Sequence, residues 1–372
     1  MSKLDDPLST KLQDAAYDTL NEYFIEHQDE VINITVLPPG MPFDSDVLIM
    51  QDGPTMGVPK STLVLAFLRA RRIFLEAEKV LRLEASRVIL LFDPEYITAT
   101  NLRKRRILGL VAKKCESGWD EYKKTLGRET IFLNSILTSP LHRQSKSPTL
   151  WHHRAWLLEF ISLTKLAEPS PDSFLLFARA ELDAVLKAGE QHPKNYYAWQ
   201  YARTLFEKLD IMFLDETEHF WKSAYHAFLT TCALLVKAWC CKHVSDVSGL
   251  SFLFFLLPRL KSVSRRRRIV RDVLDYTEKL RLDQESLWTF LRTTLASAVL
   301  EGERDALTQQ LRNYQLERIL GEQGKDEENR VTAAVKWIDM YSISLLNSPS
   351  VETGSTEKPI GPSSIMSTES KK

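Results

Sequence analysis

Hydrophobic residues recur along most of this chain at the three- and four-residue spacing of helices. Trp151, Ala155 and Leu158 stand at i, i+4 and i+7, which places them on one face of a helix. Glycine is scarce, with 13 residues in 372, and good helix formers are abundant throughout, so the pattern predicts an all-α protein. The same spacing returns twice further along the chain, at Trp199, Arg203 and Phe206 and at Trp288, Arg292 and Leu295.

The N-terminal part departs from this pattern. Residues 11–27 are predicted to form one amphipathic helix, and residues 61–91 a long helical stretch. Between them, residues 31–60 contain a β-branched run followed by prolines and glycines. We therefore divide the chain into residues 1–60, an N-terminal helix plus an extended arm lying on a neighbouring helix, and residues 61–347, a helical domain.

A repeated unit is visible within that helical domain. It consists of a short turn with Pro, Asp or Ser, then a helix with an aromatic residue about five positions in, and an arginine one turn later. The equivalent positions are 51, 48, 51 and 38 residues apart, and each interval accommodates two helices and two turns. The copies, of which the last two are weaker, lie near 93–108, 147–160, 192–206, 245–257 and 283–299. The equivalent positions are Thr100, Trp151, Trp199, Leu250 and Trp288.

The turns also carry the chemistry of helix starts. Asp93, Ser147, Asn195 and Asp283 are each predicted to cap a helix, and Pro94 and Pro148 are predicted to occupy first helical positions, where a missing N–H costs nothing. Behind each cap, the indole is expected to lie between neighbouring hairpins with an arginine stem along it. The residues assigned to this packing are Arg103, Trp151, Arg154, Trp156, Trp199, Arg203, Trp288 and Arg292.

The composition argues against classes of function that depend on a high net charge. Lys plus Arg and Asp plus Glu both total 49, so the net charge is zero and no global field attracts nucleic acid or an anionic membrane. The basic groups Arg103–Arg106 and Arg265–Arg268 are typical of solvated helix faces, with contact to an acidic partner as the alternative.

Cysteine usage and the termini indicate a reducing compartment. The four cysteines form no C-x-x-C pair, and the first residues lack the apolar stretch of a signal peptide. The apolar run at residues 250–257 is too short to span a bilayer and is interpreted as a buried helix. Residues 348–372 are rich in Ser, Thr, Pro and Gly, which predicts a disordered tail, and they end without a prenylation box.

The segments Leu150–Leu158 and Lys194–Gln200 resemble the repeats of the protein prenyltransferase alpha subunit family, whose units read approximately P-x-N-Y-x-A-W-x-x-R-x-W-x-L. The similarity covers about residues 90–300 and is closest to the repeat-only relatives, the protein prenyltransferase alpha-subunit repeat-containing proteins. It implies a right-handed superhelix of antiparallel helical hairpins, an α–α solenoid, that wraps around a separate beta subunit. In this family the beta subunit holds the zinc and the isoprenoid diphosphate, so the resemblance implies no cofactor in this chain.

The resemblance also implies site residues. Family members supply a lysine five residues before the tryptophan of the second repeat, where it stabilises the leaving diphosphate, and Lys146 matches this position. The third repeat of the family contributes Asn-Tyr-His, whereas this chain has Asn195, Tyr196 and Tyr197. Lys146 and Tyr197 are thus the candidate catalytic residues, with Asn195 and Tyr196 at the diphosphate rim. Pro148 also replaces a family tyrosine.

Structural interpretations stand beside these roles. Lys146 is equally well explained as a solvated loop lysine beside Arg143, and Asn195 as a helix cap. Adjacent histidines at 152 and 153 point about 100° apart on a helix and cannot readily share a metal. The group of Cys240, Cys241 and His243 is better explained by a buried cysteine pair, so no metal is predicted in this chain.

Two functions from different classes follow. The first is an alpha-type subunit, cytoplasmic, that acts as a transferase only as a heterodimer with a beta subunit, of the Rab geranylgeranyltransferase type, and passes a geranylgeranyl group to a cysteine-tailed acceptor protein. The second is a non-catalytic helical scaffold that uses the repeat to bind another protein. Neither involves nucleic acid or membrane insertion.

Overall fold

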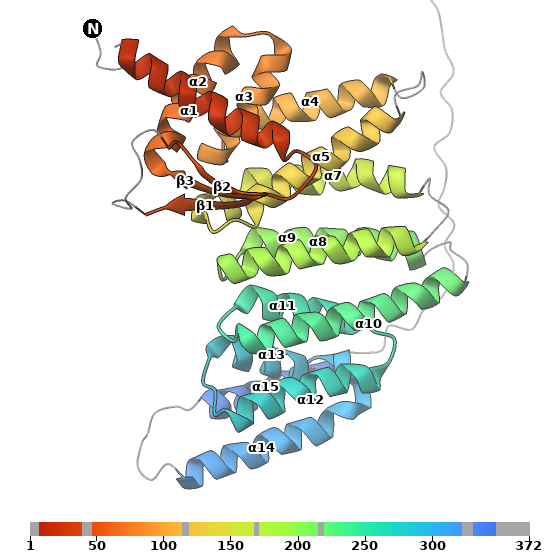
Figure 1. Ribbon diagram of the computed structural model, residues 1–372. Helices are drawn as coiled ribbons and strands as arrows, with labels where there is room; N and C mark the ends of the chain where they lie inside the picture. Colours follow the sequence, from red (N-terminus) through yellow and green to blue (C-terminus); the bar gives the residue numbers. More distant parts are fainter. Residues whose placement is uncertain are drawn as a thin grey trace, which may run out of the picture.

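The structure, a computed structural model, describes residues 7–38, 47–113, 119–166, 171–214, 219–321 and 330–346. Apart from one small sheet, this part of the chain is helical, which confirms the predicted all-α class (Figure 1). Helical hairpins follow one another in chain order along the molecule, as expected for a helical-repeat fold. The predicted tail of residues 348–372 lies outside the described residues.

Two layers of helices make up the repeat array. One layer contains the first helix of each hairpin and the other contains the second, and within each layer successive helices pack side by side, with the exception of the first two of the second layer. The first layer consists of α4 (Ile97–Lys113), α7 (Pro148–Leu166), α9 (Tyr196–Leu214), α11 (Val247–Leu256) and α13 (Glu285–Ala296). The second consists of α5 (Trp119–Leu137), α8 (Pro171–Gln191), α10 (His219–Lys242), α12 (Val263–Lys279) and α14 (Arg304–Gly321).

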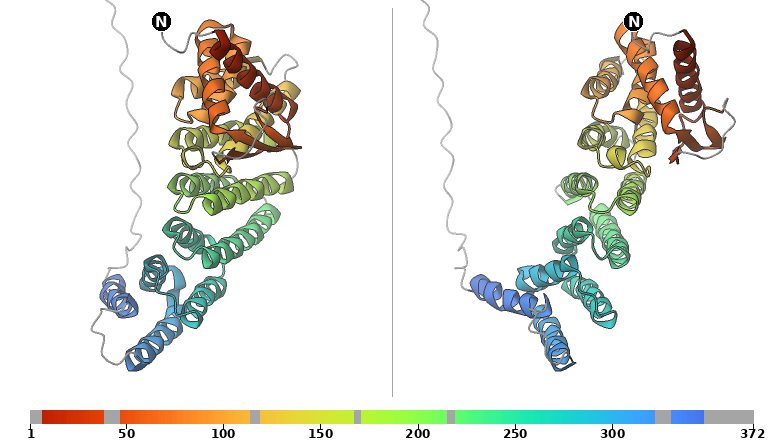
Figure 2. Two further views of the ribbon diagram at one scale, coloured as in Figure 1. Left: turned by 60° about the vertical axis from the view of Figure 1, so that its left-hand side comes forward. Right: turned by 90° about the vertical axis from the view of Figure 1, so that its left-hand side faces the viewer.

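Shorter elements join and close these layers. The short α6 (His142–Ser145) precedes α7, and the 3₁₀ turns η2 (Leu257–Arg259) and η3 (Ala298–Glu303) follow α11 and α13. Because α11 has only 10 residues before the turn that contains Pro258, the fourth repeat is the short one. The last helix, α15 (Arg330–Leu346), packs against α13, and the stack is curved when seen from the side (Figure 2).

The helical stretch expected at residues 61–91 is two helices. α2 (Lys60–Glu76) and α3 (Lys79–Phe92) pack against each other as a further hairpin, and α1 (Pro7–Glu26) lies across both. The chain breaks at Ala77, which is extended (φ −85°, ψ 173°), and Arg82 Nε donates a hydrogen bond of 2.7 Å to the Ala77 carbonyl. Neither Pro nor Gly marks this break, so the helical pattern alone could not show it.

The extended arm is a three-stranded sheet. β1 (Asn33–Leu37) pairs in parallel with β3 (Thr55–Pro59), which pairs antiparallel with β2 (Met50–Asp52), giving the order β1-β3-β2. Ile34, Met56 and Val58 are buried in the core. The Ile32 N–H donates to Ser135 Oγ on α5 at 2.9 Å, so the sheet is built into the first hairpin rather than laid over its surface.

One helix is long and apolar enough, by length and composition, to be a membrane-span candidate within the described residues. It is Trp221–Lys242, most of α10. Tyr225, Leu229, Val236 and Cys240 on this helix are fully buried, and α10 packs against α8, α9, α11 and α12. Its hydrophobic residues therefore serve the core of the repeat array.

Candidate functional site

The turns that precede the first-layer helices hold the predicted site residues. We call residues 93–96, 139–147, 192–195, 243–246 and 280–284 the turn edge. Ser147 acts as a helix cap here, because its Oγ accepts a hydrogen bond of 3.1 Å from the Leu150 N–H, and Pro148 is the first residue of α7. Asp93 and Asp283 do not cap. α4 begins at Ile97, so the prediction of Pro94 as a first helical residue was wrong, and α13 follows Gln284, which makes no side-chain cap bond.

Hydrogen bonds connect the turns at 93–96, 139–147, 192–195 and 243–246 in order. Asn195 Nδ2 donates to the Ser145 carbonyl at 2.9 Å, and Lys146 Nζ donates to the Pro193 carbonyl at 3.0 Å. Lys194, whose φ of 60° lies in the left-handed region, donates its N–H to Asp246 Oδ2 at 2.6 Å. These side chains fix the spacing between neighbouring hairpins at the edge of the stack.

The four residues assigned to the diphosphate site lie in two adjacent turns but differ in exposure. Asn195 is fully buried, and its Oδ1 accepts from the Ala198 N–H at 3.3 Å, so it caps α9 while bonding to the previous turn. Lys146 is half-buried. Tyr196 and Tyr197 are 62% and 41% exposed, and their rings meet edge to face. Only Lys146 and the two tyrosines therefore present atoms to an incoming molecule.

Charged and aromatic side chains surround Lys146. Arg143 is mostly exposed and lies 3.3 Å from Asp93, and His142 packs edge to face on His192. Burial, followed by His142 and Lys146, lowers the pKa of His192. Because Asp93 offsets Arg143 and the lowered pKa favours neutral His192, Lys146 is the residue of this group that offers positive charge to an anion.

Two arginines of the packing set form buried ion pairs inside their own hairpins. Arg154 on α7 is 1% exposed and holds Glu181 of α8 through Nε and Nη2, at 2.7 and 2.8 Å. Arg103 on α4 holds Glu129 of α5 in the same way, at 2.8 and 2.6 Å. The Tyr201 hydroxyl also donates to Glu181, which ties α9 to the pair. Sequence reasoning missed both glutamates, although their spacing from the arginines, 26 and 27 residues, repeats.

The other two arginines occupy a different position. Arg103 and Arg154 follow the repeat position by three residues, whereas Arg203 and Arg292 follow it by four and face the next helix. Arg203 donates to the Ser251 carbonyl and hydroxyl at 2.9 Å and lies over the Phe255 ring. Arg292 pairs with Glu285 and lies over the ring of Trp337 on α15. One helical turn contains both positions, so the repeat pattern did not separate them.

The indoles of the repeats are buried to different extents. Trp199 is 2% exposed and contacts Trp239 of α10 and Phe252 of α11, with ring centroids 5.1 and 5.3 Å away. A Cβ added at Gly249 would lie 2.6 Å from Trp239, so only glycine fits beside these rings. Trp151 contacts the Tyr201 ring of α9, and Trp288 stacks on Tyr314 of α14. Trp156 is half-buried, and the Lys104 ammonium group of α4 lies over its ring.

The adjacent histidines of α7 point to different surroundings. His152 is exposed, whereas His153 is completely buried, with its Nε2 3.5 Å from Glu129 Oε1. Burial lowers the pKa of His153 to about 4, against its ordinary value of 6.5, and Arg103 and Lys104 act in the same direction. His153 is therefore neutral in the native state at pH 7.

We expect the buried His153 to make stability fall as the pH decreases from 7 to 5. In this window the unfolded chain takes up a proton on residue 153 and the native chain does not, so the free energy of unfolding decreases by about 2 kcal/mol. Urea unfolding of the wild type and of His153→Gln at both pH values measures the effect. His152→Gln is the control and should keep the wild-type slope; an unchanged slope in His153→Gln would contradict the assignment.

Within the described residues, no group of three or more His, Cys, Asp or Glu side chains is arranged so that it could hold a metal ion. Cys240 is fully buried and Cys241 partly, and burial raises the pKa of both thiols. Cys115 lies outside the described residues.

Comparison with known proteins identifies the unit that these turns and helices form. The family model described as protein prenyltransferase alpha subunit repeat matches residues 178–209. The chain contains a prenyltransferase alpha subunit repeat. The matched residues run from the middle of α8 through the turn at 192–195 into α9, and they include Glu181, Asn195 and Trp199. The resemblance inferred from the sequence is thereby confirmed.

Curated proteins with this repeat are similar over about half of the chain. Protein prenyltransferase alpha subunit repeat-containing protein 1 of Homo sapiens is 26% identical over 212 residues, which cover 53% of this chain and 44% of that protein. Protein prenyltransferase alpha subunit repeat-containing protein 1-B of Xenopus laevis is 25% identical over 213 residues, 53% of this chain and 41% of the relative. The matched part thus spans less than half of the length of these relatives.

Proposed function

We propose that this chain is the alpha-type subunit of a protein prenyltransferase. The repeat at residues 178–209 carries the proposal, together with the names of the relatives that share it. In support, the exposed Tyr196 and Tyr197 of this repeat begin the helix that follows the turn to which the Lys146 ammonium group bonds. Among the residues that the structure describes there is no complete catalytic set, and we propose that a second subunit supplies the rest of the site.

Lys146 is proposed to stabilise the negative charge that develops on the leaving diphosphate. Its Nζ donates one hydrogen bond to the Pro193 carbonyl, and an ammonium group has two further donors. The Tyr197 hydroxyl is proposed as a neighbouring donor, with Tyr196 and the buried Asn195 shaping the rim. A preorganised cation of this kind lowers the barrier because it is already oriented before charge develops.

The proposed partner is a beta subunit of the Rab geranylgeranyltransferase type, which would carry the zinc and the isoprenoid diphosphate. The zinc would supply an activated thiolate from a cysteine-tailed acceptor protein. We place the heterodimer in the cytoplasm. Co-expression with candidate beta chains, followed by transfer of labelled farnesyl or geranylgeranyl diphosphate to cysteine-tailed proteins, tests the proposal. The expected result is a stable heterodimer that transfers the geranylgeranyl group; failure to bind any beta chain would refute it.

Lys146→Ala is expected to lower kcat of the heterodimer by about tenfold to a hundredfold, because one charged donor to the leaving group is lost. Lys208→Ala is a matched control, since Lys208 is also a half-buried lysine, bonded to Glu159, about 18 Å along α9 from Tyr196. Heterodimer formation is measured separately by size-exclusion chromatography. Unchanged turnover in Lys146→Ala would remove Lys146 from the mechanism.

A non-catalytic scaffold is the second candidate function. Two observations favour it: Lys146 Nζ already bonds to the neighbouring turn, and Tyr197 stands where the alpha subunit family has histidine. Affinity purification from native cells separates the two functions. A scaffold would be recovered without any prenyltransferase beta chain, whereas the proposed subunit would bring one with it.

A further inference from the structure

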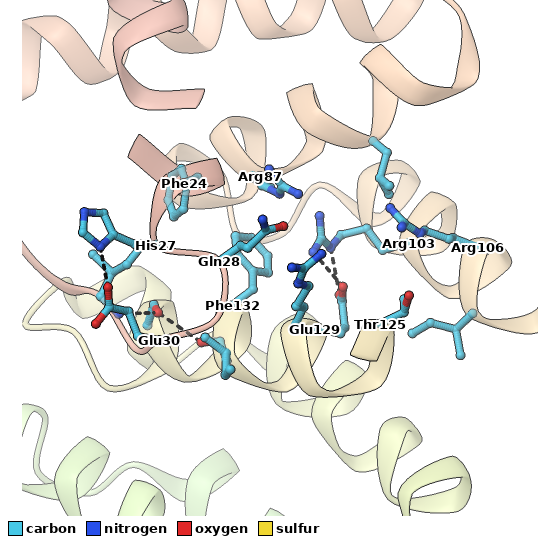
Figure 3. Close-up of a pocket in the computed structure, with 16 residues that line it drawn as sticks. Phe24, His27, Gln28, Glu30, Arg87, Arg103, Arg106, Thr125, Glu129 and Phe132 are labelled. Atoms are coloured by element: carbon cyan, nitrogen blue, oxygen red, sulfur yellow. Dashed lines mark hydrogen bonds and ion pairs between the residues drawn. The ribbon is translucent and has the colours of Figure 1, made fainter. Parts of the chain in front are cut away.

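A second group of cationic side chains lies far from the turn edge, where α3, α4 and α5 meet the end of α1. Figure 3 shows a small pocket there, with a volume of about 70 Å³. Four arginines line it, and the labelled Arg87, Arg103 and Arg106 come from α3 and α4 and approach it from one side. The fourth, Arg128, belongs to α5. None of these residues belongs to the matched repeat.

The pocket carries more positive charge than its own acidic residues neutralise. Its lining contains four arginines and two glutamates, Glu30 and Glu129, so its formal charge is +4 − 2 = +2. Arg103 is held by Glu129, and Arg128 is held by Asp29 outside the lining, at 2.8 Å through two nitrogens. With Asp29 included, the formal charge of the group is +1, and Arg87 and Arg106 are the two arginines of the lining without such a pair.

Arg87 and Arg106 have no hydrogen-bonded or ion-paired partner within the described part of the chain. Arg87 Nη1 is buried and makes no hydrogen bond. Burial and the nearby Arg103 lower the pKa of Arg87 to about 10; Arg106 adds to this, while Glu84 and Glu129 act in the opposite direction. A buried guanidinium nitrogen without a hydrogen-bond acceptor destabilises the native state, and an anion in the pocket would relieve that cost.

An apolar groove adjoins the pocket. It has a volume of about 240 Å³ and is lined by Lys79, Val80, Leu83, Leu102 and Arg106. Leu83 and Arg106 line both cavities, so the groove and the pocket lie next to each other. Val80 is 68% exposed, although it is a large aliphatic side chain. A ligand that fills both cavities therefore needs an anionic group next to an apolar one.

We propose that this pocket binds the phosphate of a phosphorylated side chain in a partner protein, with a neighbouring apolar residue of that partner in the groove of Val80, Leu83 and Leu102. A phosphate monoester has three acceptor oxygens and close to two negative charges, so it can accept charge-assisted hydrogen bonds from both Arg87 and Arg106. A carboxylate offers only two acceptor oxygens and a single charge. The groove distinguishes a peptide from free phosphate, because inorganic phosphate has nothing to place there.

Fluorescence anisotropy with a short labelled peptide, in which leucine follows phosphoserine, tests the proposal. The full chain should bind this peptide, and Arg87→Gln and Arg106→Gln should each weaken binding by about tenfold or more, because each removes a charge-assisted hydrogen bond. Arg105→Gln is the matched control: it removes the same charge from an exposed neighbouring position on α4 and should leave the Kd unchanged. Thermal unfolding of each variant verifies that it is folded.

Competing outcomes are separable in the same assay. Equal loss in Arg105→Gln and Arg106→Gln would indicate general electrostatic attraction and overturn the site. Equal affinity for a peptide with glutamate in place of phosphoserine would overturn the choice of phosphate. Competition by inorganic phosphate at the concentration of the peptide would overturn the peptide as ligand, as would binding confined to vesicles that contain phosphatidic acid.

Val80→Ser should weaken binding of the peptide but not of inorganic phosphate, which supports the role of the groove. The proposal is independent of the prenyltransferase function, and neither result bears on the other.

Discussion

Glu181→Leu is expected to lower the free energy of unfolding by about 3–5 kcal/mol, because it leaves the Arg154 guanidinium buried without its counter-charge. Arg154 is 1% exposed and donates two hydrogen bonds to this carboxylate, while its Nη1 has no partner of its own. The Tyr201 hydroxyl loses its acceptor as well. Urea unfolding followed by circular dichroism measures the change.

The double variant Arg154→Met, Glu181→Leu separates charge from packing. It removes both partners and should recover most of the lost stability, since an apolar pair of similar volume is often neutral or better in such a position. Glu159→Leu is the surface control: Glu159 is 60% exposed in its pair with Lys208, and its loss should cost about 0–1 kcal/mol. If the double variant were as unstable as Glu181→Leu, the buried-charge argument would fail.

Trp199→Ala is expected to cost about 3–5 kcal/mol, because it opens a cavity between two hairpins that has no room to collapse. The indole lies among Trp239, Phe252 and Phe206, all within the core, and Gly249 approaches the same rings closely. Thermal and urea unfolding measure the loss.

Trp199→Phe separates the effect of side-chain volume on stability from that of the unsatisfied indole N–H. The Trp199 Nε1 is buried without a partner, so phenylalanine retains much of the volume while it removes an unsatisfied donor, and it should cost less than half as much as alanine. Trp156→Ala, at a half-buried ring, should cost about 1–2 kcal/mol. Equal decreases in the free energy of unfolding for Trp156→Ala and Trp199→Ala would show that full burial of an indole between hairpins adds no stability over a half-buried one.

At the turn edge, the local sequence pattern predicted some features of the site and missed others. The cap at Ser147, the first helical position of Pro148 and the helix that starts after Asn195 were all readable, because capping depends on a few neighbouring residues. The second bond of Asn195, to Ser145, was not readable, since it joins turns 50 residues apart. The prediction of caps at Asp93 and Asp283 was wrong for the same reason, because Asp93 faces Arg143 and Asp283 faces Arg330 across the fold.

The sequence by itself determined the helical class and three of the buried indoles, those of Trp151, Trp199 and Trp288, because helical periodicity and turn chemistry are local properties of the chain. Only the tertiary structure decided which charges were neutralised inside and which were left over. Glu129 and Glu181 meet their arginines because helices of one hairpin pack face to face, whereas Arg87 and Arg106 converge from different helices on a pocket without an acid for each of them. Electrostatic pairing depends on distance in space, and that distance is fixed only when the hairpins stack.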